Sequence, residues 1–376
     1  MDGLWRRGVF QKVLRSSPTL QDRVFTSRFN YKIKQKGAEF NKCKVRLAVQ
    51  GQHMRRKGED SVGDYDDAFS PVPAASGSCT ILSLATQQNM FTDHVDISQA
   101  FVLGELLPGD GHNGKVCTSS PPGYDEDPLY VIRLLIPLYG MPSAARAWHT
   151  TMRVFLAKEE CATVGFEKSM CTVTIDDARI LLGAHIDDFV ITCANQQILD
   201  AFRVRLLDAF EGTYEGTLQH YLGCEMTHDM DKGTTYLSQT HYAKEILRTY
   251  NFWNVTSHLT PMQPNTRLEK GDGDKNPAPD FHRRYHGIVG SLGYLQTMTR
   301  ADLAWAYLSS VSMCIFQERI TRLPLITICL NFAILGIKRF SILVTFTKTL
   351  TFCGVGWMRI WLGKLTPADH KRKIFS

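Results

Sequence analysis

The arrangement of apolar and polar residues along the chain predicts several β-strands, and the clearest of these form a hairpin. Residues 180–194, ILLGAHIDDFVITCA, are two apolar runs separated only by Asp187 and Asp188. Two such runs around a short polar break predict a β-hairpin with both carboxylates at its tip. Residues 171–176, CTVTID, predict a further strand, and the alternating segment FTDHVDI predicts another that ends at Asp96.

Helical periodicity and shorter strand patterns account for much of the remaining chain. After the hairpin, one helical face is apolar and carries Ile198, Leu199, Phe202, Leu206, Leu207 and Phe210. Helices are further expected over residues 78–90, the second part of 139–156, and 241–250. Strands are further expected over residues 29–33, 42–49, 221–226 and 234–238. The Gly-, Pro- and acid-rich residues 107–127 predict an exposed loop. This mixture predicts an α+β fold rather than a doubly wound sheet.

Composition narrows the class of protein without identifying it. The chain has 376 residues, of which 44% are hydrophobic and 21% charged, so it can form a sizeable core and does not have the composition of a disordered or collagen-like chain. Lys and Arg number 43 against 37 Asp and Glu, which gives a formal charge of +6. Such mild basicity is compatible with nucleic-acid binding but does not establish it.

The cysteine pattern and the apolar runs bear on the compartment. The 10 cysteines form no CxxC pair, which argues against a zinc ribbon or a disulfide scaffold and favours a reducing compartment. The first ten residues lack the apolar core of a secretory signal. The longest apolar run, residues 323–337, contains Pro324 and Asn331 and is shorter than the roughly 18 residues that a membrane-spanning helix needs. We therefore expect an intracellular protein that does not associate with membranes.

The adjacent carboxylates Asp187 and Asp188 are the unusual feature of the hairpin. Two acids between strongly apolar strands repel each other, and their desolvation costs several kcal/mol unless cations or water compensate for it. Successive side chains on a strand point to opposite faces, so only one of the two easily shares a face with a third acid. Asp96, at the end of another alternating strand, is the best candidate for that third acid.

Carboxylates that converge from neighbouring strands could hold two divalent cations about 4 Å apart, an arrangement that serves phosphoryl transfer. Mg²⁺ suits such a site because it keeps several waters and takes only one or two carboxylates plus substrate phosphates. The alternative is that Asp187 and Asp188 merely fill a solvated hairpin turn, where Asp is common. Spacing alone does not decide between the two interpretations.

A series of motifs in a fixed order gives the chain a family resemblance. Over roughly residues 28–310 it resembles the reverse transcriptase of copia-type (Ty1-like) LTR retrotransposon polyproteins. The family's basic K-A-R-L-V-A-Q-G strand is matched by KVRLAVQG at 44–51, and its D-V-x-x-A-F-L motif by DISQAFV at 96–102. The L-Y-G-L-K-Q-S-P-R-A-W motif is matched by LYGMPSAARAW at 138–148, and the Y-V-D-D box by HIDD at 185–188.

The resemblance implies roles for individual residues. Asp96, Asp187 and Asp188 would be the catalytic carboxylates and would hold two Mg²⁺ ions, or Mn²⁺ in their place, with Asp96 and Asp187 the more direct ligands. The other implied residues are Phe101, which would exclude a sugar 2′-hydroxyl; Lys44, Arg46 and Arg146, which would contact the nucleotide or template; and Tyr221, Leu222 and Gly223, which would steady the primer end. The alternatives are core packing for Phe101 and the Tyr221–Gly223 segment, a solvated strand for Lys44 and Arg46, and a surface ion pair for Arg146.

The resemblance also implies an architecture and its partners. Residues 28–200 would form fingers and an RRM-like palm of a right-hand polymerase, residues 201–312 a thumb or connection, and residues 1–27 a poorly defined segment. The partners would be an RNA or DNA template-primer and deoxynucleoside triphosphates, in a cytoplasmic particle or the nucleus. Two other readings are a catalytically silent transposon relic and a nucleic-acid-binding fragment that does not polymerise.

Some residues depart from the family pattern. His185 replaces the usual aromatic of the aspartate box, and Pro142 and Ser143 stand where the family commonly has Lys and Gln. Residues 313–376 do not continue into the expected RNase H sequence. Residues 356–363, read two bases out of frame, permit the Asp-Ala-Asp-containing RNase H opening, so we expect a frameshifted remnant there. The coding DNA tests this, because absence of the motif from every shifted frame would contradict it.

Overall fold

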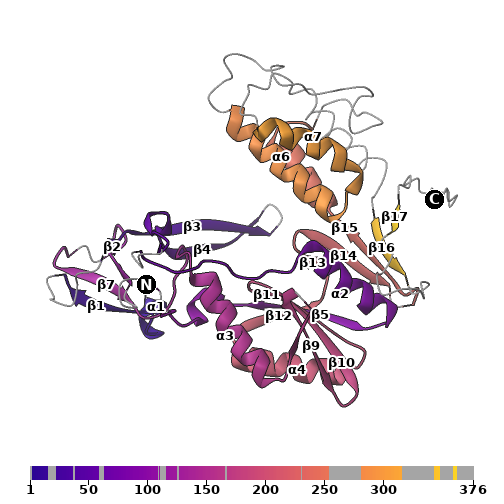
Figure 1. Cartoon of the computed structure of the whole chain (residues 1–376), viewed down its shortest axis with the longest axis horizontal. Coiled ribbons are helices and arrows are strands. Elements are labelled where there is room, and N and C mark those ends of the chain that lie inside the picture. Colours follow the sequence, from indigo (N-terminus) through magenta and orange to yellow (C-terminus); the bar gives the residue numbers. More distant parts are fainter. Residues whose placement is uncertain are drawn as a thin grey trace. The chain divides into compact units, whose positions relative to one another are not determined.

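The computed structural model describes twelve stretches of the chain, which form two compact units (Figure 1). The described residues are 2–15, 23–36, 39–58, 63–108, 110, 116–124, 127–165, 167–229, 231–253, 281–315, 343–347 and 359–361. The first unit consists of residues 1–74 and 92–216, and the second of residues 75–91 and 217–376. The helix and strand after residue 195 belong to the first unit, and the functional division at residue 200 that the resemblance implies stays a prediction.

A six-stranded sheet forms the larger part of the first unit. Its order is β12-β5-β11-β10-β9-β8, where the strands in chain order are β5 (Phe91–Ile97), β8 (Ala162–Val164), β9 (Glu167–Ile175), β10 (Ala178–His185), β11 (Asp188–Cys193) and β12 (Gly212–Thr217). β10 and β11 pair in antiparallel register from Ile180↔Cys193 to His185↔Asp188. The predicted hairpin with carboxylates at its tip is therefore confirmed, as is the mixed α and β composition.

Two helices supply the core of this sheet, α3 (Ala144–Lys158) and α4 (Gln196–Ala209). α4 begins where the side chain of Asn195 accepts hydrogen bonds from the backbone N–H groups of Gln197 and Ile198. Its buried residues Leu199, Phe202 and Leu206 recur at helical spacing and pack in one cluster with strand residues such as Ile191 and Val95. The predicted apolar face of this helix is thus the face that it buries.

Shorter strands complete the first unit. A four-stranded sheet has the order β1-β7-β6-β2, from β1 (Phe10–Leu14), β2 (Val24–Phe25), β6 (Val116–Thr118) and β7 (Tyr130–Leu134). Beside these strands in the sequence are α1 (Asp2–Arg6), the hairpin of β3 (Ser27–Lys36) with β4 (Glu39–Val49), and the short helices η1 (Gly51–His53) and η2 (Ala100–Leu103). A second core cluster joins them through buried side chains that include Phe10, Leu47, Val116 and Leu138.

The expectation of an exposed loop over residues 107–127 is wrong in its middle. Val116, Cys117 and Thr118 are fully buried in β6, and the carboxylate of Asp110 is buried where the backbone N–H of Leu107 donates to it. A three-residue strand between Gly- and Pro-rich stretches is too short to show alternation, so the composition of its flanks dominates the sequence pattern. Of the described residues on either side of this strand, 107–108, 110 and 119–124 lie outside helices and strands.

The second unit combines a five-stranded sheet with four helices among its described residues. The sheet order is β13-β14-β15-β16-β17, from β13 (His220–Tyr221), β14 (Cys224–Asp229), β15 (Thr234–Ser238), β16 (Leu343–Thr347) and β17 (Arg359–Trp361). The helices are α2 (Ala75–Gln87), α5 (Thr240–Thr249), α6 (Phe281–Met298) and α7 (Ala304–Ile315), with η3 (Ala301–Leu303) before the last. The predicted hairpin of residues 221–226 with 234–238 is confirmed by the pairing from Glu225↔Ser238 to Asp229↔Thr234.

Two expectations from the sequence concern segments largely outside the described residues. The apolar run at 323–337 lies wholly outside them, and of residues 313–376 only 313–315, 343–347 and 359–361 are described. In the part of the chain that is described, none of the helices has both the length and the apolar character for crossing a bilayer.

Candidate active site

The turn between β10 and β11 presents Asp187 and Asp188. His185 pairs with Asp188, so Ile186 and Asp187 form the tight connection. Ile186 adopts φ +59°, in the left-handed region that a β-branched residue rarely occupies. The indole Nε1 of Trp148 on α3 donates a 2.6 Å hydrogen bond to the Ile186 carbonyl oxygen. This bond holds the strained turn in place, and with it the two carboxylates.

Asp96 lies on the strand next to this hairpin. β5 neighbours β11 in the sheet, and the backbone N–H of Ile97 donates a 2.8 Å hydrogen bond to the carbonyl oxygen of Asp187. On the other side of β5, the N–H of Ser98 donates to the carbonyl oxygen of Glu211. The end of β5 is therefore bonded on both sides, and the structure brings Asp96 beside Asp187, as the sequence predicted.

The three carboxylates influence one another electrostatically. Burial raises the pKa of the Asp96 carboxyl, and the negative charges of Asp187 and Asp188 raise it further. Burial likewise raises the pKa of Asp187, and the charge of Asp188 adds to this. The positive charge of Lys44 lowers the pKa of both groups. A concentration of half-buried negative charge is thus incompletely neutralised by the protein's own cations.

The chemistry of these donors fits a hard divalent cation. Carboxylate oxygens are the ligands that Mg²⁺ prefers, and Mg²⁺ needs only one or two of them when substrate phosphates and water supply the rest. Within the described part of the chain, no three His, Cys, Asp or Glu side chains are gathered closely enough to form a complete metal-binding group. Asp96, Asp187 and Asp188 therefore fit as partial ligands of a shared site and do not enclose an ion by themselves.

One contact at the carboxylates was not found by sequence reasoning. His94 lies two residues before Asp96 on β5, and its Nε2 is 3.2 Å from Oδ1 of Asp188. Alternation along a strand places residues 94 and 96 on the same face, which is the pattern that could have indicated this histidine. His94 thus borders the acidic cluster on the side of Asp188.

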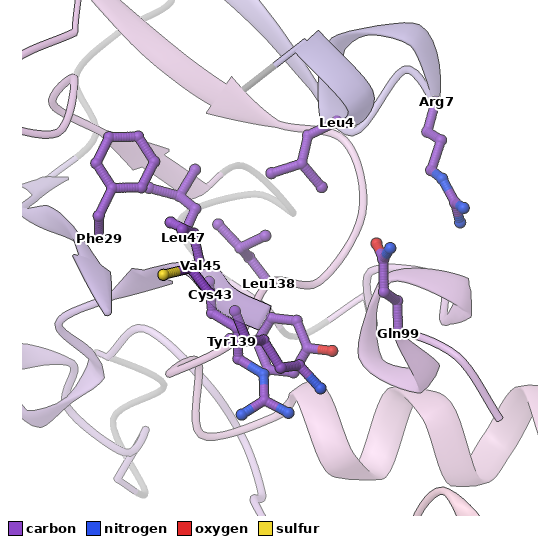
Figure 2. Close-up of a pocket in the computed structure, with 11 residues that line it drawn as sticks. Leu4, Arg7, Phe29, Cys43, Val45, Leu47, Gln99, Leu138 and Tyr139 are labelled. Carbon is purple, nitrogen blue, oxygen red and sulfur yellow. The ribbon is translucent and has the colours of Figure 1, made fainter. Parts of the chain in front are cut away.

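A cavity of about 490 Å³ lies in the first unit (Figure 2). Its lining residues are Leu4, Arg7, Phe29, Cys43, Lys44, Val45, Arg46, Leu47, Gln99, Leu138 and Tyr139. In Figure 2, Phe29, Leu47 and Leu138 form an apolar side, whereas Gln99 and Arg7 reach toward the cavity from the other. Lys44 and Arg46 belong to this lining, and their charges lower the pKa of Asp187. The cationic part of the cavity is therefore within electrostatic reach of the carboxylates.

The structure also shows the contacts of Phe101 and Arg146, the other predicted nucleotide-binding residues. The ring of Phe101, in η2, is partly buried and packs against both core clusters of the unit. It also meets Tyr139, with ring centroids 5.3 Å apart. Arg146, on α3, forms an ion pair with Asp67, with Nη1 and Oδ2 3.7 Å apart. The surface ion pair that the sequence left open for Arg146 is thus present, and Phe101 has core contacts as well as an aromatic neighbour.

The predicted primer-contacting residues belong to the second unit. Tyr221 is buried and pairs with Cys224, and Leu222 and Gly223 form the turn between β13 and β14 with φ +48° and +67°. A Cβ atom added to Gly223 would lie 3.5 Å from the Tyr294 hydroxyl oxygen, so the turn packs closely on α6. These contacts show how the turn is held and leave its part in primer binding a prediction.

The sequence of this chain matches a known protein family over most of its length. Residues 13–264 match the family described as reverse transcriptase (RNA-dependent DNA polymerase). The retrovirus-related Pol polyprotein from transposon RE2 of Arabidopsis thaliana is 31% identical over 290 residues, which are 75% of this chain and 18% of that protein. The Pol polyprotein from transposon RE1 of the same plant is 30% identical over 290 residues, again 75% of this chain and 18% of that protein.

A more distant relative and a solved structure extend the comparison. The Pol polyprotein from transposon TNT 1-94 of Nicotiana tabacum is 26% identical over 298 residues, which cover 76% of this chain and 21% of that protein. The chain thus spans about a fifth of the length of these relatives. The structure of the foamy viral protease-reverse transcriptase dRH in complex with ds DNA is similar at 11% identity and a TM-score of 0.46, covering 89% of this chain and 46% of that chain.

Proposed function

Because the chain belongs to the reverse transcriptase family of copia-type retrotransposon polyproteins, we propose that its first unit catalyses RNA-directed DNA synthesis at Asp96, Asp187 and Asp188. The reaction is attack of a primer 3′-hydroxyl on the α-phosphorus of a deoxynucleoside triphosphate, with release of pyrophosphate. The single observation that carries the proposal is the backbone bond from Ile97 to Asp187, which places Asp96 beside the hairpin tip.

The carboxylates have a definite part in this proposal. Reverse transcriptases generally use divalent metals, and in this chain Asp96 and Asp187 would be the main ligands, with Asp188 beside them. Bound Mg²⁺ or Mn²⁺ would stabilise charge on the attacking and leaving oxygens. Asp96 and Asp187 themselves would orient the reacting groups through their fixed backbone positions. Their pKa values, raised by burial and by mutual repulsion, are what cations would bring down.

The cavity supplies the remaining elements of a nucleotide site. Lys44 and Arg46 lie two residues apart on β4, so their side chains share a face of the strand, and both line the cavity. We assign them to the triphosphate, and Phe101 to the sugar, where a ring would fill the space that a 2′-hydroxyl needs. Arg146 would contact the nucleotide or template from its position beside Asp67. The Tyr221–Gly223 turn would steady the primer end. Template phosphates would bind through cations and be released by salt.

The proposal is tested by primer extension on an RNA template with Mg²⁺. Wild type is expected to extend the primer and Asp187→Asn to abolish extension, because the amide has lost the charge that a cation needs. Asp177→Asn is a matched control, since Asp176 and Asp177 are exposed carboxylates at the other end of β10. No extension by purified, folded wild type would overturn the proposal, as would equal extension by wild type and Asp187→Asn.

A further inference from the structure

The main chain of Tyr139 is fastened to the end of β4, the strand that carries Lys44 and Arg46. The backbone N–H of Val49 donates a 2.8 Å hydrogen bond to the carbonyl oxygen of Tyr139. The next residue, Gly140, has φ +87°, and a Cβ atom there would lie 2.0 Å from the Val49 carbonyl oxygen. Only glycine allows this close approach, so the position of Tyr139 is set by the strand itself.

The side chain of Tyr139 contacts two proposed nucleotide-binding groups at once. The guanidinium carbon of Arg46 lies 5.2 Å from the centroid of the Tyr139 ring. The Phe101 ring meets the same tyrosine edge to face, with centroids 5.3 Å apart and an interplanar angle of 61°. Such contacts have preferred geometries, so the tyrosine ring restricts both neighbours. Tyr139 is also one of the residues that line the cavity (Figure 2).

The environment of the tyrosine hydroxyl links this group to the carboxylates. Burial raises the pKa of Tyr139, and the charges of Asp187 and Asp96 raise it further, whereas Arg46 lowers it. The hydroxyl therefore stays protonated at neutral pH. It lies within the electrostatic reach of both the acidic cluster and the cationic wall of the cavity.

We propose that Tyr139 is a positioning residue that determines sugar specificity, because its ring, which is part of the cavity lining, holds Phe101 and Arg46 in a fixed relation to each other. The inference rests on the proposed polymerase function and deepens it. With the triphosphate bound by Arg46, the sugar reaches the Phe101 ring only at a separation set by the tyrosine between them. Loss of the Tyr139 ring leaves Phe101 held on its core side alone, so it excludes a 2′-hydroxyl less well.

The test compares variants that keep or remove the ring. Tyr139→Phe keeps both ring contacts, whereas Tyr139→Leu and Tyr139→Met remove them with side chains of similar volume, the second unbranched and flexible. Tyr130→Leu is the matched control, because Tyr130 is a half-buried tyrosine of the same unit with Lys12 4.4 Å from its ring centroid, and it does not line the cavity. The ratio of kcat/KM for a deoxynucleotide to that for the matching ribonucleotide is measured for each.

The expected pattern separates positioning from general structure. Tyr139→Phe and Tyr130→Leu keep the sugar preference within about twofold of wild type, and Tyr139→Leu and Tyr139→Met lower it about tenfold, mainly through faster ribonucleotide use. KM for the deoxynucleotide also rises in these two variants, because Arg46 loses its support. Thermal unfolding identifies folded variants, and Tyr139→Met decides if Tyr139→Leu does not fold.

Failure of the inference and failure of the proposed function would give different results. An active wild type whose sugar preference is unchanged in Tyr139→Leu and Tyr139→Met overturns the inference and leaves the proposed function standing. A folded wild type that incorporates no nucleotide contradicts the proposed function. In that case equilibrium titration with the same deoxynucleotide and ribonucleotide still decides the inference. We expect the Kd for the ribonucleotide divided by the Kd for the deoxynucleotide to fall in Tyr139→Met. An unchanged ratio overturns the inference.

Discussion

The imidazole of His94 lies against the carboxylate of Asp188, with 3.2 Å between Nε2 and Oδ1. The His94 side chain is only 16% exposed, so the contact is sheltered from water, whereas Asp188 is 36% exposed. Asp96 shares a strand face with His94, so the histidine lies on the side of β5 that carries this acid. Its contact with Asp188 restricts the orientation of that carboxylate.

Substitution of His94 is expected to lower polymerase activity through Asp188. His94→Leu removes the polar contact, and a hydrogen bond to a charged group contributes about 1.5–3 kcal/mol, so kcat/KM should fall about 10- to 100-fold. His94→Gln preserves a polar atom near Asp188 and is expected to retain most of the activity. The measurement is steady-state nucleotide incorporation with both variants. Equal rates for His94→Leu and wild type would show that the contact has no part in orienting the acid.

The bond from Trp148 to the hairpin turn predicts a second effect. Trp148 is 1% exposed, and its Nε1 satisfies the Ile186 carbonyl oxygen at a residue with φ +59°. Trp148→Phe leaves that oxygen without its donor and opens a small space, so we expect a loss of about 2 kcal/mol in the free energy of unfolding. Urea denaturation measures this loss. Trp305→Phe, at a tryptophan that is 73% exposed, serves as the control and should leave stability unchanged.

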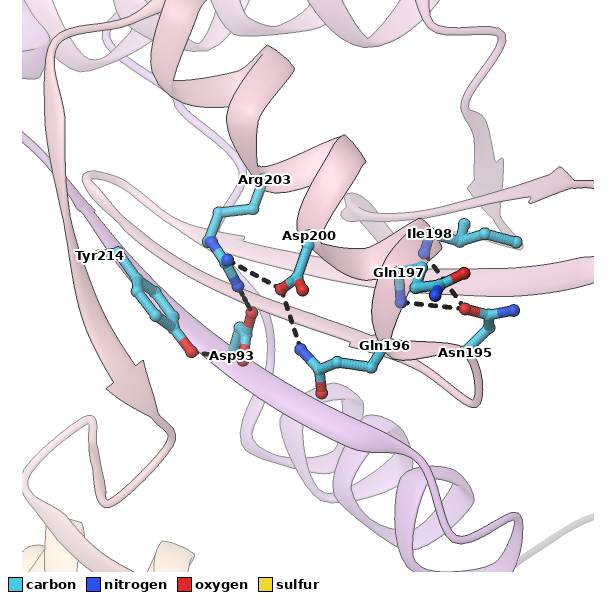
Figure 3. A network of polar contacts seen from close by, with 8 residues as sticks. All are labelled: Asp93, Asn195, Gln196, Gln197, Ile198, Asp200, Arg203 and Tyr214. Atoms are coloured by element: carbon cyan, nitrogen blue, oxygen red, sulfur yellow. Dashed lines mark hydrogen bonds and ion pairs between the residues drawn. The ribbon is translucent and has the colours of Figure 1, made fainter.

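A buried ion-pair network beneath the site predicts a third effect (Figure 3). Asp93 on β5 forms an ion pair with Arg203 of α4 and accepts a 3.1 Å hydrogen bond from the Tyr214 hydroxyl of β12. Arg203 also pairs with Asp200 on its own helix. The network joins a helix and two strands three residues before Asp96, so it supports the strand that carries Asp96.

Arg203→Met is expected to destabilise the first unit by about 3 kcal/mol, because it leaves a buried carboxylate without its cation. Burial already raises the pKa of Asp93, and hydrogen bonds from Arg203 and Tyr214 lower it in opposition. A raised folded-state pKa favours folding at acid pH, and the benefit is lost as pH rises through that pKa. Removal of Arg203 raises the pKa further, so the destabilisation should be larger at pH 7 than at pH 4.

Urea denaturation of Arg203→Met and wild type at both pH values checks this prediction. Lys232→Met removes an exposed ion pair with Asp229 and is the control, for which no measurable change in stability is expected at either pH. A destabilisation by Arg203→Met that does not depend on pH would mean that lost packing, rather than the unpaired Asp93 carboxylate, is responsible.

Much of the fold and of the acidic cluster was predictable because it depends on local pattern. The two apolar runs around Asp187 and Asp188 are joined by a short turn and pair with each other, and the alternating strand before Asp96 ends beside them. The contacts that were missed join residues far apart in sequence. Arg203 with Asp93 is such a pair, and for Arg146 the sequence left an ion pair open without identifying Asp67 as its partner, because no periodicity selects one charge among many.

The sequence pattern also did not predict the strained backbone at Ile186 or the short strand β6. Ile186 adopts the left-handed region without being glycine, because the ladder on either side and the Trp148 bond impose it. β6 is a strand of three buried residues, fewer than alternation needs to be visible. Sequence reasoning thus predicted the candidate carboxylates at the hairpin and did not identify the groups that hold them in place.

Replacement of Asp96 by a neutral residue is expected to abolish polymerase activity and to raise thermal stability. Burial and the charges of Asp187 and Asp188 raise the pKa of Asp96, so wild type loses stability as pH rises through that pKa. Asp96→Asn removes this loss, and its Tm at pH 7 should exceed that of wild type by about 2–4 °C, with the difference disappearing near pH 3. Primer extension by the same variant should be abolished.

Addition of Mg²⁺ should reverse the order of stability. Cations that bind the folded wild type raise its Tm by mass action, whereas Asp96→Asn has lost a ligand charge and gains less. Thermal unfolding at increasing Mg²⁺, with Asp177→Asn as the control, measures both effects. The control should respond to Mg²⁺ as wild type does, because Asp177 is exposed at the opposite end of β10. If Asp96→Asn gained as much from Mg²⁺ as wild type, Asp96 would not be a ligand of the cation.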